Sequence, residues 1–228
     1  MIKKILNKIR KARFAKRQLY KIHKKGTLIN SFYESKTIFI HIPKTAGISL
    51  VKSIFGDVTL EGHRFVSFYK QVFGNRYSDF FTFTIVRNPW DRLYSAYKFL
   101  EKGGINIHDK NAFETHLSAY KDFEDFVLKG LNEKIIWEIT HFIPQYEFVC
   151  DKNGKIIVDY VGKFDNLNKS LDEINDILKS DFELQHHNKT DNMDYKDIYT
   201  TEMIEKVHQI YQKDIDIFEY SFILKCSN

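Results

Sequence analysis

Two short, almost continuous apolar segments stand out in a chain whose other apolar positions are mostly periodic. Thr37 to His41 and Phe80 to Val86 are rich in β-branched and aromatic residues, as strands covered on both faces are. A helical pattern follows each: Ile48 to Phe55 after the first, and a helix that begins at Asn88-Pro89 after the second. The second helix runs through Tyr97 and stops at two glycines, 103 and 104. The pattern therefore predicts two strand-loop-helix units.

The rest of the chain continues this alternation. Asp122 to Leu128 is predicted as a helix capped by Asp122, and Ile156 to Phe164 as a third strand after a turn signal. Ser170 to Leu178 and Thr201 to Phe218 have helical periodicity, whereas residues 105–120 look like an irregular insertion. Strands that alternate with helices predict an α/β fold with three layers, α/β/α, around a central parallel sheet.

Composition limits the class of protein. With 43% hydrophobic and 15% aromatic residues the chain is globular, and 3 Pro and 10 Gly leave no room for a long flexible linker. The chain contains no run of 18 apolar residues, so no membrane span is predicted. It also has no continuous apolar stretch after the N-terminal cations, so no secretory signal is predicted. Cys150 and Cys226 match no metal or redox spacing, which favours a reducing compartment.

Charge separates an N-terminal arm from the rest. Residues 1–33 contain 11 Lys or Arg and no acid, which leaves 24 basic against 30 acidic side chains and a net of −6. Ile2, Ile5, Leu6 and Ile9 have helical spacing among the cations and predict a basic amphipathic helix. Residues 1–25 could contact an anionic membrane surface. The alternatives are a solvated helix that packs on the domain and an arm that binds nucleic acid. The net negative charge of the rest of the chain disfavours the nucleic-acid arm. The predicted division is an arm, 1–33, and a catalytic domain, 34–228.

The loop after the first strand has the features of a phosphate site. It consists of Pro43, Lys44, Thr45, Ala46, Gly47, Ile48 and Ser49. Backbone N–H groups and the positive end of a helix meet there, Lys44 adds a full charge, and Gly47 permits close approach of a ligand. The Gly-Lys-Ser/Thr ending of ordinary P-loops is absent, which weakens an ATPase or kinase reading. An ordinary turn with a surface lysine is the alternative.

A second candidate site follows the second strand. Arg87 comes directly after that strand, where ligands of open α/β sheets bind, and its guanidinium suits a phosphate. Ser95 lies two helical turns further on and could add a hydroxyl. Asp91 and Arg92 are also explained as a helix-start carboxylate and its partner.

Together, the segments at residues 41–49 and 86–97 resemble sulfotransferases that use 3′-phosphoadenosine 5′-phosphosulfate (PAPS). The resemblance is to the carbohydrate branch that includes the heparan 2-O-sulfotransferases, and it covers about residues 36–222. Weaker echoes follow at Phe142–Tyr146, Asp159–Leu167, His187–Thr190 and Tyr211–Tyr220. The resemblance implies a P-loop-NTPase-like sulfotransferase fold, PAPS as donor, PAP as product and no metal.

The resemblance also implies roles for individual residues. Lys44 would stabilise charge on the leaving phosphate. The residues that would cradle the 5′-phosphate are Thr45, Gly47 and Ser49, and those that would bind the 3′-phosphate are Arg87, Ser95, Lys189 and Thr190. Ile48 departs from the family pattern, which usually has a hydroxyl residue there, and this puts one hydrogen bond in doubt.

Sulfuryl transfer to a hydroxyl needs a base, and histidine has the pKa for it. His63 lies between the two donor segments and resembles the Gly-His segment that supplies the base in uronyl 2-O-sulfotransferases. His141 is the second candidate, Glu61 is a fallback, and His41 is interpreted as structural.

The leading hypothesis is a cytoplasmic carbohydrate O-sulfotransferase, with a location at the inner face of the membrane as an option. The lack of a membrane anchor suggests a bacterial enzyme that acts on a capsular polysaccharide or glycolipid. A nucleotide kinase or other P-loop-type NTPase, and a non-catalytic binding module, are the alternatives. Residues 57–79 and 100–120 are expected to line the acceptor groove, but the sugar cannot be deduced from them.

Overall fold

The structure is a computed structural model that describes residues 2–60, 62–184 and 194–223. These residues form two compact units. The first contains residues 2–42, 46–60, 62–85 and 147–184, and the second contains residues 43–45, 86–146 and 194–223. The chain thus passes from the first unit to the second and back within the loop that precedes Gly47.

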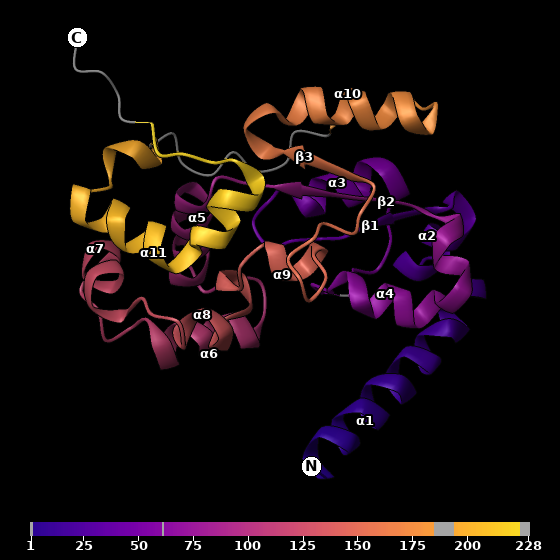
Figure 1. Cartoon of the computed structure of the whole chain (residues 1–228), viewed down its shortest axis with the longest axis horizontal. Coiled ribbons are helices and arrows are strands. Elements are labelled where there is room, and N and C mark those ends of the chain that lie inside the picture. Colours follow the sequence, from indigo (N-terminus) through magenta and orange to yellow (C-terminus); the bar gives the residue numbers. More distant parts are fainter. Residues whose placement is uncertain (1, 61, 185–193, 224–228) are drawn as a thin grey trace. The chain divides into compact units, whose positions relative to one another are not determined.

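The first unit contains a three-stranded sheet and helices packed on it, with α2 against β1 and α10 against β3 (Figure 1). Its strands and helices are β1 (Thr37–Phe39), β2 (Phe81–Val86), β3 (Tyr160–Lys163), α1 (Ile2–Leu19), η1 (Tyr20–His23), α2 (Leu28–Ser35), α3 (Gly47–Phe55), α4 (Val66–Phe73), η2 (Gly74–Asp79), α9 (Tyr146–Val149), η5 (Phe164–Asn166) and α10 (Leu167–Leu178). The last residue of β2 and the first of α9 group with the second unit.

β2 is the central strand of the sheet. The strand order is β1-β2-β3, and β1 pairs with β2 in parallel with Phe39 opposite Phe83. The two threonines that interrupt the apolar run of β2 are buried and hydrogen-bonded: Thr84 Oγ1 donates to Ile40 O at 2.8 Å, and Thr82 Oγ1 to Asp159 Oδ2 at 2.7 Å. Their polar groups are therefore satisfied by the chain on either side of β2. The α/β fold predicted from the sequence is confirmed.

The second unit is helical and has an aromatic core. Its elements are α5 (Pro89–Glu101), α6 (Ile107–His116), α7 (Phe123–Asp125), the π-helix η3 (Phe126–Gly130), α8 (Ile135–Glu138), η4 (Thr140–Phe142), η6 (Tyr195–Asp197) and α11 (Thr201–Phe218). Buried side chains of α5 and α11 pack with those of η3 and η4. Hydrogen bonds from the polar ends of aromatic side chains link these elements. Trp90 Nε1 donates to Ile204 O at 3.0 Å, and Tyr211 Oη donates to Phe142 O at 2.7 Å.

A buried charge pair fixes the segment between η4 and α9. Arg92 of α5 donates to His141 O at 3.0 Å and to Ile143 O at 2.9 Å. Asp214 of α11 accepts from the backbone N–H groups of residues 145 and 146, each at 2.8 Å. Burial lowers the pKa of Arg92 and raises the pKa of Asp214, and the charge of each opposes the shift of the other. Residues 141–146 are thus held from both sides by charged hydrogen bonds.

Most predicted elements are present. The three strands, the helix after Asn88, the Asp122 cap and the C-terminal helix Thr201–Phe218 are confirmed, and the helix of the N-terminal arm extends to Leu19. The prediction of an irregular insertion at 105–120 is wrong, because Asn106 Oδ1 accepts from the N–H groups of residues 108 and 109 and so caps α6. The division into an arm and a catalytic domain stays a prediction. Among the described residues, no helix has the length and hydropathy that crossing a bilayer requires.

Candidate active site

The loop between β1 and α3 has a strained backbone. Lys44 and Ala46 have positive φ angles of 69° and 62°, each of which costs an L-residue about 1 kcal/mol or more. Gly47 begins α3 directly against a histidine: a Cβ at this position would lie 1.9 Å from Cδ2 of His41. Ala46, at the N-cap, has no side-chain oxygen that could accept from the first N–H groups of the helix. Such a helix start suits an anion.

The predicted donor residues of this loop divide between the two units. Pro43, Lys44 and Thr45 belong to the second unit, and the other four residues of the loop to the first. Pro43 and Thr45 are buried, Lys44 is half-buried, and Ile48 is 41% exposed on the first turn of α3. The exposure of Ile48 fits a position where the resemblance expects a hydroxyl residue.

Lys44 has an unusual environment for a lysine. Its Nζ lies 4.1 Å from the ring centre of Phe99 in α5, a cation–π distance. Burial, as the main cause, and the positive charge of Arg87 lower the pKa of Lys44 to about 8, whereas Asp109 opposes the shift. The side chain is therefore still largely charged at neutral pH but close to losing its proton.

Arg87 is the second cation of this group, and each of its three guanidinium nitrogens donates a hydrogen bond. Its Nε and Nη2 donate to Asp91 Oδ2 and Oδ1 at 2.6 and 2.7 Å, and its Nη1 donates to Lys44 O at 3.0 Å. The side chains of Arg87 and Asp91 are only 12% and 17% exposed. Asp91 does lie in the first turn of a helix, but its partner is Arg87; the alternative pairing with Arg92 is wrong. The guanidinium thus joins the start of α5 to the backbone of the lysine loop.

Gln145 fixes the backbone from which Arg87 projects. Its Oε1 accepts from Arg87 N at 2.9 Å, and its Nε2 donates to Arg87 O at 2.8 Å. Gln145 is fully buried, and its own N–H donates to Asp214. The conformation of Arg87 is therefore set by a chain of buried hydrogen bonds that begins on α11.

A carboxylate and a histidine complete the surroundings of Lys44. Asp109 Oδ2 accepts from Ile105 N at 3.0 Å and Asn106 Nδ2 at 2.8 Å, and its Oδ1 lies 3.9 Å from His141 Nδ1. The His141 ring also packs on Phe99, with ring centres 5.0 Å apart. The second candidate base therefore shares the Phe99 ring with Lys44.

His63 lies in the first unit, beside His41. Its Nδ1 is 3.1 Å from His41 O, and the two rings are 4.4 Å apart in an edge-to-face arrangement. Since a carbonyl oxygen only accepts, Nδ1 carries a proton in this hydrogen bond, and in the neutral ring Nε2 then has the lone pair that a general base requires. His41 itself is buried and stacked on Phe39, which supports its interpretation as structural.

Ser95 is half-buried on α5. Lys189, Thr190 and the fallback base Glu61 lie outside the described residues. The site predictions thus stay predictions, although Lys44 and Arg87 are in one unit and share a hydrogen bond. No group of three His, Cys, Asp or Glu side chains with metal-site geometry occurs in the described part of the chain.

Sequence reasoning missed three residues that shape the surroundings of Lys44 and Arg87. The sequence pattern did not indicate a role for Phe99 or Asp109. Phe99 looked like a core residue of a helix, and Asp109 lay in a segment predicted to be an irregular insertion. Gln145 did give one, since it belongs to a segment that resembles the family. Hydrogen bonds to backbone atoms do not follow from residue spacing, so its role needed the structure.

A strained loop at a helix start, with a half-buried lysine and an arginine that donates to the carbonyl of this lysine, suits the binding of an anionic group on an α/β fold. Comparison with models of protein families matches residues 29–221 to the sulfotransferase family. This match covers most of the chain, and the protein belongs to the sulfotransferase family. A search of curated proteins found no match, and neither did a search of solved structures. Because it belongs to this family, the protein is a transferase of sulfuryl groups.

Proposed function

We propose that this sulfotransferase transfers the sulfuryl group of PAPS to a hydroxyl of a carbohydrate, by in-line displacement with a histidine as base. The acceptor is a glycan, a capsular polysaccharide or a glycolipid, and the enzyme acts in the cytoplasm of a bacterium. The carbohydrate acceptor and the His base come from the resemblance of the donor and Gly-His segments, and the fold proposed with them is the three-layer, P-loop-NTPase-like one.

The observation that carries the proposal is the pairing of Lys44 with Arg87. Two cationic side chains of low exposure lie in one unit, and Arg87 Nη1 donates to the carbonyl of Lys44. Asp91 is a carboxylate partner of Arg87, and Lys44 Nζ lies over an aromatic ring. Like charges held together in this way repel one another, and a ligand with more than one negative charge relieves that repulsion. PAPS carries phosphate and sulfate groups of this kind.

Lys44 would stabilise the charge that develops on the phosphate as the S–O bond breaks. A full positive charge in a poorly solvated position is effective in this role, because it needs no reorganisation of water. The loop from Pro43 to Ser49 would hold the 5′-phosphate with backbone N–H groups and hydroxyls, and Arg87, Ser95, Lys189 and Thr190 the 3′-phosphate.

His63 would take the proton of the acceptor hydroxyl. Its Nδ1–H, directed to His41 O, leaves the lone pair on Nε2. His141 is the competing base, because it lies 3.9 Å from a carboxylate that could stabilise its protonated form. Kinetics can separate these two histidines.

The donor is tested first by equilibrium binding in EDTA. We expect 3′-phosphoadenosine 5′-phosphate (PAP) to bind more tightly than ATP or ADP, and Lys44→Ala to weaken PAP binding at least tenfold. Lys52→Ala, at an exposed lysine of α3, is the matched control and should bind PAP like the wild type. A preference for ATP would overturn the PAPS proposal and favour a nucleotide kinase.

The reaction is tested by transfer of ³⁵S from labelled PAPS to a panel of polysaccharides and glycolipids. His63→Ala should lower the rate at least a hundredfold and leave PAP binding unchanged. His208→Ala, at an exposed histidine of α11, is the control and should change neither the rate nor PAP binding. Loss of transfer in His141→Ala but not in His63→Ala would assign the base to His141. Transfer to a protein tyrosine or a phenol, with none to any glycan, would refute the carbohydrate acceptor.

A further inference from the structure

Helix α1 exposes apolar side chains that the fold does not use. Ile5, Leu6 and Ile9 are 52%, 54% and 42% exposed. They are spaced one, three and four residues apart, so that they lie on one side of the helix. Isolated exposed apolar residues are normal, but three adjacent ones on one helix face form a patch.

A different face of α1 attaches the helix to the first unit. Phe14 packs on Phe68 of α4 with ring centres 5.9 Å apart, the guanidinium of Arg64 lies 5.1 Å from the Phe14 ring, and Gln18 is buried. Phe14 and Gln18 are four residues apart and lie about 150° around the helix from the Ile5–Leu6–Ile9 face. By helical periodicity, the apolar patch is therefore directed away from the packing that holds α1 in place.

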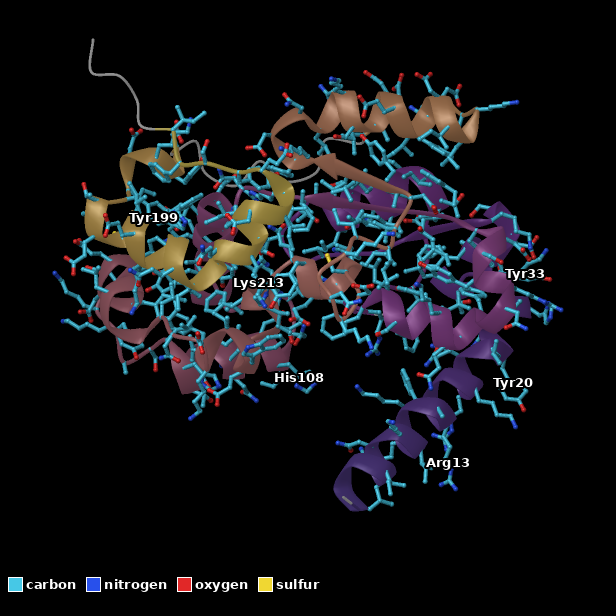
Figure 2. All side chains as sticks on the ribbon, in the orientation of Figure 1. Arg13, Tyr20, Tyr33, His108, Tyr199 and Lys213 are labelled. Atoms are coloured by element: carbon cyan, nitrogen blue, oxygen red, sulfur yellow. The ribbon has the colours of Figure 1, made fainter. Side chains whose placement is uncertain are left out.

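The charge of α1 points to the partner of this face. Residues 2–19 contain eight Lys or Arg and no Asp or Glu. By helical periodicity, Arg13 and Lys16 continue the face of Ile9, and Arg13 is exposed (Figure 2). An apolar patch flanked by cations matches the boundary between acyl chains and anionic headgroups of a lipid bilayer.

Other partners fit these observations less well. A second copy could cover the apolar patch, but it would bring together two helices with eight cations each, and like charges repel. A nucleic acid would suit the cations but would leave the isoleucines and the leucine exposed to water. The anionic bilayer satisfies both features.

We propose that α1 docks this protein on an anionic phospholipid surface, with Ile5, Leu6 and Ile9 inserted among the acyl chains and the cations at the headgroups. Docking of this kind is peripheral and reversible, since the patch extends over little more than one helical turn. It goes beyond the proposed transfer reaction and does not depend on which sugar is the acceptor. It would concentrate the enzyme where lipid-linked acceptors are found.

The test is co-sedimentation of the full chain with vesicles of phosphatidylcholine, alone or with 30% phosphatidylglycerol. We expect binding to the anionic vesicles only, weakened at least tenfold between about 0.05 and 0.5 M salt as the charges are screened. The variant Ile5→Ser/Leu6→Ser/Ile9→Ser should lose at least tenfold in affinity. Its matched control, Ile105→Ser/Ile107→Ser/Ile177→Ser, removes three isoleucines that are 72%, 61% and 50% exposed elsewhere, and should bind within twofold of the wild type.

The following results would overturn the proposal. They are equal binding to neutral vesicles, unchanged binding of the α1 triple variant, and a wild-type dimer that the triple variant converts to a monomer, which would assign the patch to a second copy. Tight binding to duplex RNA with no vesicle binding would also refute it. PAP affinity, measured on the same samples, should be unaltered in the triple variant. Vesicle binding therefore tests the docking proposal, and PAP binding tests the donor proposal independently of it.

Discussion

Replacing Lys44 with methionine is expected to remove sulfuryl transfer and at the same time to stabilise the fold. The reason is the position of its ammonium group, which burial and Arg87 make unfavourable, so that its pKa falls from 10.5 to about 8. Methionine has a similar length and a soft thioether that can pack on the Phe99 ring without a charge. The variant thus distinguishes the contribution of the charge to sulfuryl transfer from its effect on the free energy of unfolding.

The magnitude follows from proton linkage. A lysine that binds its proton more weakly in the folded state makes the unfolded state take up protons, so this group destabilises the fold fully below pH 8, and the effect is lost as the pH rises from 8 to 10.5. The shift of Lys44 corresponds to roughly 3 kcal/mol at pH 7 and falls to about half of that at pH 9.5, as the lysine of the unfolded chain begins to lose its proton. The attraction of the charged group to the Phe99 ring, worth about 0.5–1 kcal/mol, reduces the expected gain of Lys44→Met to roughly 2–3 kcal/mol at pH 7.

The assay is urea unfolding followed by far-UV circular dichroism at pH 7 and pH 9.5. Lys52→Met serves as control and should change the free energy of unfolding by less than about 0.5 kcal/mol at both values. The stabilisation of Lys44→Met should shrink by about half between the two. A variant less stable than the wild type at pH 7, or a gain that does not change with pH, would refute the account of Lys44 as a buried, partly desolvated cation.

Three further changes test the site. Arg87→Lys cannot keep both the carboxylate fork and the bond to the Lys44 carbonyl, and should weaken PAP binding about 10- to 100-fold in a calorimetric titration, with far-UV dichroism unchanged. Gly47→Ala places a Cβ 1.9 Å from the ring of His41 and should cost at least about 2 kcal/mol in urea unfolding; a neutral effect would refute the tight packing at the start of α3. PAP binding at pH 8.5 should take up roughly 0.7 proton, because a bound phosphate restores the charge of Lys44, and Lys44→Met should abolish this uptake; it is measured from heats in buffers of different ionisation enthalpy.

The strands and most helices could be predicted because their signals are local. The apolar run at residues 81–86 favours a buried strand, and the Asn-Pro sequence at residues 88 and 89 favours a helix start. The structure has β2 and α5 at these positions. The helix α6 was missed because it has almost no amphipathic pattern: only its cap, Asn106, marks its start, and the polar run around it resembles a loop. Periodicity fails for a helix that buries little of its surface.

The same contrast holds for the candidate site. Lys44 and Arg87 could be selected from the sequence, because each lies close to the carboxyl end of a predicted strand. The surroundings that give Lys44 its charge state could not, since they come from α5 and α6 at positions with no shared spacing. A motif identifies the residue that bears the charge, whereas the pKa depends on tertiary neighbours.

The energetics of Lys44 give a reason why a sequence would retain it. A left-handed backbone, a buried ammonium group and an adjacent guanidinium all disfavour the folded state, and none of them is needed to build β1 or α3. A protein selected for stability alone would replace this lysine, as the expected gain of Lys44→Met indicates. An anion bound beside Lys44 offsets the two electrostatic terms, because it raises the pKa of Lys44 and reduces the repulsion from Arg87. Strain and charge at this loop are therefore explained together by ligand binding, and the same argument applies to the neighbouring hydrogen bonds of Gln145, which hold Arg87 close to Lys44 against their mutual repulsion.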